Sequence, residues 1–285
     1  MKNFEKLNSF LLPGLGLIAI AISFLALGIL LFQSASQGME YLSWRFLVEF
    51  PSRIPAEAGI FSSLIGSFYL LILTAIIAIP LGIFTAVFIE EYLPEARFTA
   101  FLRLNIANLA AIPSVVYGML GLAFFVRFLG MERGLLVTAI TLSLLIVPVI
   151  ILASIEAIRA IPKSLREAAY GVGATKAQVT FLQVLPQAMP GILTGIILAL
   201  SRAAGETAPI LVIGGLVFAR FLPESLNDQF TTLSVQIFNW SSRPQEEFHA
   251  LAASAILVLL GLTLGLNLLA IILRAKLMRK KSLLV

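Results

Sequence analysis

Long runs of apolar residues, separated by short polar segments, dominate the chain. Six of these runs are long enough to form helices that cross a membrane, since about 20 apolar residues span the hydrocarbon core of a bilayer. They cover residues 11–32, 60–89, 104–129, 135–158, 191–218 and 250–273. The pattern therefore predicts an all-α, polytopic membrane protein with six transmembrane helices, several of them longer than the membrane requires.

The composition excludes a soluble globular protein. Of the 285 residues, 59% are hydrophobic and only 12% are charged, and the mean hydropathy is +1.00. Such values are typical of a chain that is buried mostly in lipid. We expect two parts: an N-terminal anchor helix with an external segment at 1–59, and a core domain at 60–285. The core domain holds five transmembrane helices and a cytoplasmic loop at 159–189.

The first apolar run has two interpretations. Lys2 and Lys6 precede it and small residues at 34–36 follow it, as in a cleavable signal peptide. Its apolar part is about 22 residues, however, whereas the apolar part of a signal peptide usually has 7–15. We therefore expect a retained membrane anchor.

The basic residues set the expected orientation. With the N-terminus inside, 13 of the 20 Lys and Arg residues lie on the cytoplasmic side and six lie outside. This asymmetry follows the positive-inside rule and places both termini in the cytoplasm. The cytoplasmic residues are Lys2, Lys6, Arg97, Arg103, Arg159, Lys163, Arg166, Lys176, Arg274, Lys276, Arg279, Lys280 and Lys281.

The loop between the fourth and fifth runs carries helix signals of its own. Ser164 and Glu167 have the spacing of a capping box, and Thr175 and Gln178 repeat it. Gly171 and Gly173 lie between them and disfavour helix by about 1 kcal/mol each relative to alanine. We expect two short helices joined by a glycine elbow, either docking a partner protein or serving as an interfacial helix or plain connector.

The two glutamates that end the second run, Glu90 and Glu91, lie at the cytoplasmic end of a helix. We expect them to be solvated, because carboxylates at helix ends usually face water. Contact with a partner protein or with a neighbouring loop is the alternative.

The fifth run contains an unusual polar stretch. Arg202 is the only basic residue deep within a predicted span, and an arginine at the centre of a membrane helix costs about 2.5–3.5 kcal/mol on insertion scales. Glu206 shares its helix face four residues later and is the expected partner. Pro209 lacks an amide proton and clashes with the carbonyl of Gly205, so the helix should kink or open there.

This stretch again allows two interpretations. Arg202 and Glu206 are either an internal ion pair that makes the span tolerable, or part of a solute path. Broken helices at membrane depth lie against protein or a water-filled cavity, which favours a path lined by Arg202, Glu206 and Thr207. The planar guanidinium of arginine matches tetrahedral oxyanions such as phosphate, and the nearby carboxylate would help the anion leave.

The cytoplasmic loop resembles the EAA loop of the permeases of ABC importers. In those permeases the loop docks the membrane subunit onto a separate ATPase, and Gln183 is the one departure, since the family usually has an aliphatic residue there. The resemblance implies an ABC type I importer fold and ATPase-coupling roles for Glu167, Ala168, Ala169, Gly173, Leu185 and Pro186.

The stretch from Arg202 to Pro209 is similar to the PstA family of phosphate permeases, and Pro190 to Gly195 precede it as in that family. The resemblance implies a multi-pass permease in the bacterial or archaeal cytoplasmic membrane that carries inorganic phosphate, with Arg202 and Glu206 on the path. The implied partners are a PstC-like permease, a PstB-like ATPase dimer and a PstS-like phosphate-binding protein. ATP and Mg²⁺ would be used by the ATPase, and no cofactor is expected in this chain.

Other classes of function have weaker support. A permease for another oxyanion remains open, and so does a proton-coupled secondary anion carrier, although a carrier has no need of an EAA-like loop. No phosphate-binding loop and no catalytic Ser-His arrangement occurs in the sequence, so we expect no enzymatic site. The chain has no cysteine, and His249 is its single histidine, so we expect no metal site.

Overall fold

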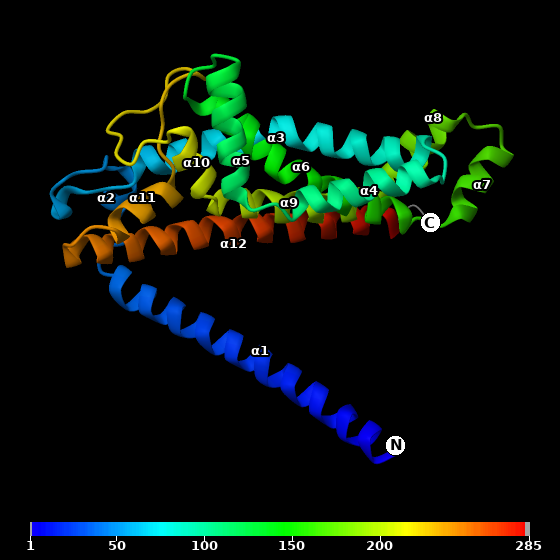
Figure 1. The fold of residues 1–285 in the computed structure, drawn as a ribbon, viewed down its shortest axis with the longest axis horizontal. Helices are drawn as coiled ribbons and strands as arrows, with labels where there is room; N and C mark the ends of the chain where they lie inside the picture. Colours follow the sequence, from blue (N-terminus) through cyan, green and yellow to red (C-terminus); the bar gives the residue numbers. More distant parts are fainter. Residues whose placement is uncertain (1, 283–285) are drawn as a thin grey trace.

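A computed structural model describes the backbone of residues 2–282 and the side chains of residues 14–276, except 270 and 273. Within those residues every regular element is a helix (Figure 1). Five helices are long and apolar enough to cross a membrane, and one sharply bent helix pair can supply a sixth crossing. This confirms the predicted fold class. The side chains of Lys2, Lys6, Arg279, Lys280 and Lys281, used above for orientation, lie outside the described residues.

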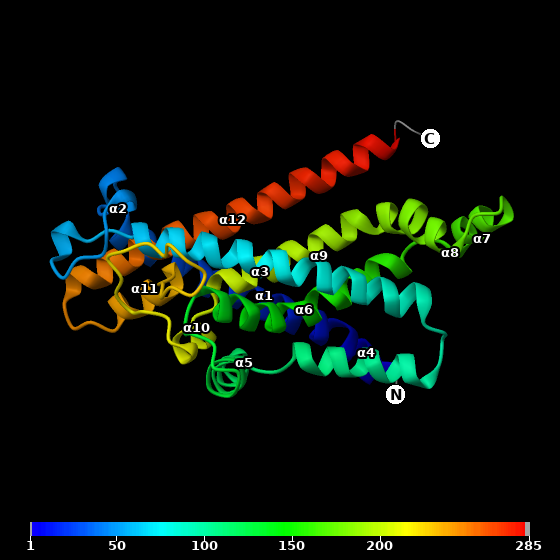
Figure 2. The ribbon, with the colours of Figure 1, turned by 90° about the horizontal axis from the view of Figure 1, so that it is seen from above.

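Long helices that run side by side form the body of the protein. They are α3 (Phe61–Val87), α6 (Leu135–Arg159), α9 (Leu185–Gly205) and α12 (Glu246–Ser282), with the shorter α4 (Arg97–Ala110) beside them (Figures 1 and 2). α6 is the most enclosed, because it packs against α3, α4 and α9. Fully buried aliphatic residues such as Ile146, Ile150 and Ile192 fill the space between these helices.

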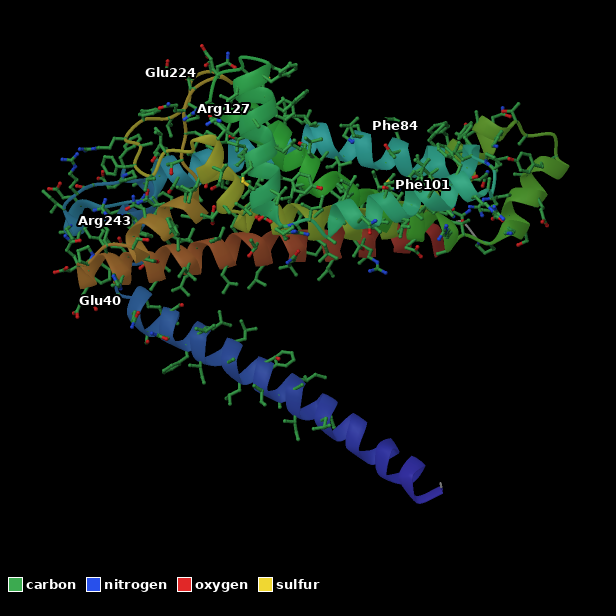
Figure 3. The ribbon with its side chains drawn as sticks, viewed as in Figure 1. Glu40, Phe84, Phe101, Arg127, Glu224 and Arg243 are labelled. Carbon is green, nitrogen blue, oxygen red and sulfur yellow. The ribbon has the colours of Figure 1, made fainter. Side chains whose placement is uncertain are left out.

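The outer faces of the body are apolar, as a lipid environment requires. Phe84 on α3 and Phe101 on α4 are 60% and 59% exposed, and they lie along the length of the body in Figure 3. The labelled charged residues Arg127, Glu224 and Arg243 lie toward the end of the body opposite α7 and α8. Exposed apolar side chains such as those of Phe84 and Phe101 are stable along a helix bundle only where lipid or another subunit covers them.

The third predicted span is not continuous. α4 ends at Ala110, α5 (Ser114–Gly121) leaves it at 94°, and a π-helical segment, η3 (Leu122–Phe128), continues α5. The prediction of one helix over 104–129 was therefore wrong. Pro113 causes the break, because it cannot donate a backbone hydrogen bond and disfavours helix in the residue before it. The hydroxyl of Tyr117 donates to the freed carbonyl of Leu109 at 2.9 Å.

The fifth span is displaced from its predicted bounds. It begins with α8 (Lys176–Gln178), continues through the π-helical η4 (Val179–Val184) and ends with α9 at Gly205. The predicted range of 191–218 was therefore wrong at both ends. After the break, α10 (Ala208–Ile213) is only six residues long and stops at Gly214, whose φ of +118° is a conformation that favours glycine. Apolar residues beyond it belong to a loop.

The end of the body opposite α8 is closed by short helices. They are α2 (Trp44–Val48), the 3-10 turn η1 (Pro55–Glu57) and α11 (Leu233–Ser241). Trp240 of α11 is fully buried between Phe46 and Phe248, with ring centroids 6.1 and 6.3 Å away. Aromatic packing of this kind holds the segment between the fifth and sixth spans on the body.

α1 (Lys2–Gly38) diverges from the other helices. Only its C-terminal end meets the body, where the hydroxyl of Ser254 in α12 donates to the carbonyl of Gly38 at 2.6 Å. Its apolar side chains from residue 14 onward are exposed over most of its length. The division into parts at 1–59 and 60–285 stays a prediction. Both views place the starting end of α1 and the final end of α12 toward the same end of the body as α7 and α8 (Figures 1 and 2).

Candidate functional site: a glycine elbow and a broken fifth span

The predicted glycine elbow is present. α7 (Lys163–Gly171) ends next to a turn in which Gly173 has a φ of +85°, and its N–H donates to the carbonyl of Tyr170 at 2.9 Å. Glycine adopts this left-handed backbone without steric cost. The capping box that begins α8 is confirmed, because the Gln178 side chain accepts from the Thr175 amide at 2.8 Å and Thr175 Oγ1 accepts from the Gln178 amide at 3.4 Å.

Two details of the elbow differ from the prediction. The capping box at Ser164 does not form, because α7 begins at Lys163 directly after Pro162, and Ser164 then lies inside the first turn. The second short helix is also not separate. α8 runs into η4 and α9 without a break, since its capping box starts a helix and no residue after it stops one.

The predicted coupling residues lie on different parts of the loop. Glu167 and Ala168 are exposed on α7, and Ala169 is half-buried against the core. Leu185 is half-buried at the start of α9, while Pro186 next to it is exposed in the first turn. The tip beside Gly173 carries apolar side chains in the open, with Val172 86% exposed. Such a tip is a surface that a partner protein can cover.

The two glutamates at the end of α3 are not solvated, so the primary expectation for them was wrong. Glu90 and Glu91 lie in the π-helical turn η2 (Phe88–Tyr92), and their side chains are only 9% and 7% exposed. Glu90 forms ion pairs with Arg103 at 2.7 Å and Arg159 at 3.1 Å, and Glu91 forms one with Arg166 at 2.8 Å. The partners come from distant parts of the chain, so the local pattern at residues 88–92 gave no sign of them.

The predicted pair within the fifth span is formed. The Nε of Arg202 lies 3.4 Å from Oε1 of Glu206, at the last turn of α9. The arginine side chain is 43% exposed and the glutamate side chain 13% exposed. The guanidinium is therefore partly open to a solute, whereas the carboxylate is mostly enclosed. At 3.4 Å the contact is long for a charge-assisted hydrogen bond, which is usually 2.7–2.9 Å.

The predicted opening of the helix also occurs. Glu206 has extended backbone angles, φ −68° and ψ 131°, and Pro209 lies in the first turn of α10. The carbonyl of Glu206 accepts a hydrogen bond from the hydroxyl of Ser234 in α11 at 2.8 Å, which satisfies one freed backbone group. Thr207 Oγ1 lies 3.5 Å from the carbonyl of Gly205, so its hydroxyl has only a weak partner in its own turn.

The break of the fifth span lies against the break of the third. A Cβ placed on Gly118 of α5 would lie 2.6 Å from the Cα of Pro209, so a side chain at position 118 would not fit. α5 and α10 therefore pack backbone to backbone. The two interrupted spans therefore meet beside the charged pair, and broken helices are tolerated at membrane depth only against protein or a water-filled cavity. Chemically, the arrangement sets a partly exposed guanidinium fork, a group that matches oxyanions, beside a carboxylate.

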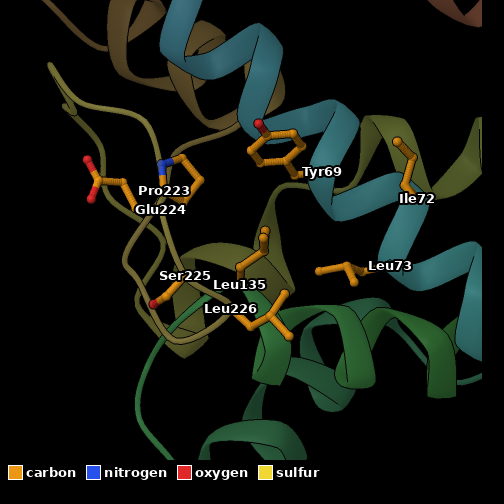
Figure 4. A pocket seen from close by; sticks show the side chains of 8 residues that line it. All are labelled: Tyr69, Ile72, Leu73, Leu135, Pro223, Glu224, Ser225 and Leu226. Atoms are coloured by element: carbon orange, nitrogen blue, oxygen red, sulfur yellow. The ribbon is translucent and has the colours of Figure 1, made fainter.

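A separate cavity of about 490 Å³ lies toward the end of the body opposite the elbow (Figure 4). Ser225 and Glu224 belong to a loop that Asp228 organises, because its carboxylate accepts from both of their amides and from the Ser225 hydroxyl. These hydrogen bonds, led by that of the hydroxyl, lower the pKa of Asp228. None of the predicted site residues lines this cavity, whose walls are Tyr69, Ile72, Leu73, Leu135, Pro223, Glu224, Ser225 and Leu226.

Comparison with known proteins gives consistent matches. The model of the family "Binding-protein-dependent transport system inner membrane component" matches residues 78–280. The probable ABC transporter permease protein YqgI of Bacillus subtilis is 34% identical over 277 residues, which cover 92% of this chain and 94% of the relative. The phosphate transport system permease protein PstA 1 of Mycobacterium tuberculosis strain H37Rv is 31% identical over 225 residues, covering 79% and 72%.

The fold has solved counterparts as well. One chain of a bacterial alginate ABC transporter, solved in complex with an alginate pentasaccharide-bound periplasmic protein, superposes with a TM-score of 0.63. The match covers 94% of this chain and 93% of the other at 16% sequence identity. At this identity the likeness concerns the fold alone.

Proposed function

Because the chain belongs to the family of inner membrane components of binding-protein-dependent transport systems, we propose that it is the permease subunit of an ATP-driven phosphate importer. It moves inorganic phosphate across the bacterial or archaeal cytoplasmic membrane. It pairs with a PstC-like permease, and a PstB-like ATPase dimer drives both. A PstS-like binding protein delivers the ion. ATP and Mg²⁺ bind to the ATPase, and this chain contributes no catalytic residue.

The broken fifth span carries the proposal. Arg202 presents a partly exposed guanidinium beside an opened helix, next to the mostly enclosed carboxylate of Glu206. A hydrogen phosphate ion passing this point accepts hydrogen bonds from the guanidinium, which replaces part of the hydration of the ion. Glu206 competes for the same guanidinium. The ion therefore binds weakly enough to move on, and Thr207 supplies a further hydroxyl at the break.

The choice of phosphate rests on the relatives. Several proteins that match over most of the chain carry the name phosphate transport system permease protein PstA, including one of Haemophilus influenzae. Sulfate and molybdate have the same tetrahedral shape, so an arginine alone does not distinguish them from phosphate. In this proposal most of the selectivity lies in the binding protein, and the permease provides a path for a tetrahedral oxyanion.

The elbow between α7 and α8 is the proposed contact with the ATPase. It lies at the same end of the body as the ends of α1 and α12, and that end carries most of the basic residues of the chain. The positive-inside rule makes this end cytoplasmic. Glu167, Ala168, Ala169 and Gly173 face the ATPase, while Leu185 and Pro186 hold the start of α9, through which the movement reaches Arg202.

Transport by the purified complex in proteoliposomes tests the proposal. We expect phosphate uptake that requires ATP, the ATPase and the binding protein, and little uptake of sulfate or molybdate. Uptake of sulfate or molybdate in preference to phosphate would identify a permease for another oxyanion. Uptake by this chain alone under a proton gradient, with no need for the ATPase, would show a secondary carrier and refute the proposal.

A further inference from the structure

The π-helical turn η2, which continues α3, joins α3 to α4, α6 and α7 through two adjacent carboxylates. Glu90 contacts Arg103 on α4 and Arg159 in the last turn of α6, and Glu91 contacts Arg166 on α7. Successive residues on a helix point in different directions, so the two carboxylates reach different partners. Both side chains are more than nine-tenths buried by their exposed fractions of 9% and 7%. We call these five residues the cytoplasmic clamp.

Arg166 is the most constrained member of the clamp. Its Nε and Nη2 donate to Oε1 of Glu91 at 3.2 and 2.8 Å. The same guanidinium donates to the carbonyl of Ile161 at 2.8 Å and to that of Ile158 at 3.1 Å, which caps the end of α6. One side chain of α7 therefore fixes the position of α7 relative to both α3 and α6, with charge-assisted hydrogen bonds in an enclosed site.

A second contact joins the other arm of the elbow, α8, to the same turn, η2. The ammonium group of Lys176 on α8 lies 5.2 Å from the ring centroid of Tyr92, within the range of a cation–π interaction. Arg166 precedes Gly173 in the chain and Lys176 follows it. Both arms of the elbow thus contact neighbouring residues, Glu91 and Tyr92, although only α6 and α9 are covalently joined to the elbow.

The tip and the base of the elbow have opposite character. At the tip, Val172 is 86% exposed and a side chain on Gly173 would meet no neighbouring atom. At the base, Arg166 has only 18% of its side chain exposed, above a core that includes the buried Ile89, Ile158 and Val179. A force applied at the tip therefore acts on a base that is tied to α3.

We propose that Arg166 and Glu91 are positioning residues that transmit the ATP-driven displacement of α7 into α3, and through Glu90 and Arg103 into α4. The inference rests on the proposed function. α4 leads into the broken third span, where Gly118 lies against Pro209. The clamp thereby connects the elbow to the proposed phosphate path by a second route, in addition to the covalent route through α9. Without it, movement of α7 reaches α3 only indirectly, through the packing of α3 on α6 and α9.

The coupling ratio of the complete complex, phosphate ions transported per ATP hydrolysed, tests this. Arg166→Gln should lower the ratio about tenfold, within the range of measured coupling free energies between sites, while ATP hydrolysis and complex assembly persist. Arg97→Gln is the matched control, because it removes an exposed arginine at the same end of the protein.

Because removal of one clamp residue can also harm folding, a reversible chemical cross-link between positions 91 and 166 provides the second measurement. The chain has no cysteine, so Glu91→Cys with Arg166→Cys places the only two thiols of this subunit at the clamp. With cysteine-free partner subunits, the reduced double variant should hydrolyse ATP with a low coupling ratio. Joining the two thiols with a short bis-thiosulfonate reagent should restore the coupling ratio. The same reagent on either single variant should not restore it.

The outcomes are distinct. A normal coupling ratio in Arg166→Gln, or no recovery on cross-linking a complex that assembles, overturns the proposed role of the clamp. The clamp merely stabilises the fold if ATP hydrolysis and transport fall equally and the complex assembles poorly, and if the cross-link changes only thermal stability. Absence of ATP-driven phosphate uptake in the unaltered complex would instead contradict the proposed function itself.

Discussion

Gly118 lies directly against Pro209, so that the backbones of two interrupted spans touch. A Cβ on Gly118 would come within 2.6 Å of the Cα of Pro209 and 3.2 Å of its carbonyl oxygen. The close approach explains why α10, although only six residues long, has a fixed place beside α5. The geometry of the break at Glu206 depends on it, because Pro209 follows that residue by three positions.

Replacing Gly118 with alanine should destabilise the protein and disturb the break. Overpacking in a closely packed site costs about 1–3 kcal/mol, and here the atom that must move belongs to the backbone. We expect a lower unfolding temperature in detergent and reduced transport. Gly261→Ala is the control, since a Cβ on Gly261 in α12 meets no atom within 4 Å. Equal unfolding temperatures for both variants would contradict the proposed packing.

Replacing Gly173 with aspartate should disrupt coupling to the ATPase and leave membrane insertion intact. At φ +85° a residue with a Cβ is strained by about 1–2 kcal/mol, and the new charge adds to the exposed tip. The ATPase retained on the purified permease is the measurement. Gly171→Ala is the matched control, because Gly171 lies in the same loop, has no positive φ and has open space around it. Normal ATP-driven transport by Gly173→Asp would argue against the elbow as the docking site.

The loop held by Asp228 should open at acidic pH. Its hydrogen bonds lower the pKa below the ordinary value of 3.8, so the ionised form favours the folded loop. This stabilisation is complete above pH 3.8 and is lost as the pH falls through the lower, folded-state pKa. Asp228→Asn should therefore make the amide hydrogens of Glu224 and Ser225 exchange faster at neutral pH, because a neutral amide oxygen is a weaker acceptor than a carboxylate. Glu224→Gln, which keeps Asp228, should leave them unchanged.

The sequence was a good guide at four places where short-range rules apply. The structure contains the predicted capping box at Thr175, the elbow at Gly173, the pairing of Arg202 with Glu206 and the opening before Pro209. Each involves residues within a few positions of one another. Propensity, proline geometry and i,i+4 spacing therefore suffice to predict them.

The errors at the fifth span and at Glu90 and Glu91 have a common physical cause, which is contact between distant residues. An apolar window does not distinguish a span from a loop packed on protein, so the fifth span was extended past Gly205 toward residue 218. The burial of Glu90 and Glu91 depends on arginines at positions 103, 159 and 166, which only the folded chain brings together. Arg166 enters the sequence analysis only as one of the basic residues that set the orientation, and its role at the end of α6 has no local sequence signal.

ATP-driven accumulation of labelled phosphate by the complete complex, with this chain unaltered or carrying Arg202→Gln, tests the central claim most directly. We predict rapid accumulation by the unaltered complex and a loss of about tenfold or more in the variant, since a hydrogen bond to a charged group contributes about 1.5–3 kcal/mol. Assembly and thermal stability should change far less. Equal accumulation by the two complexes would contradict the account, and would make Arg202 and Glu206 an internal ion pair without a role in transport.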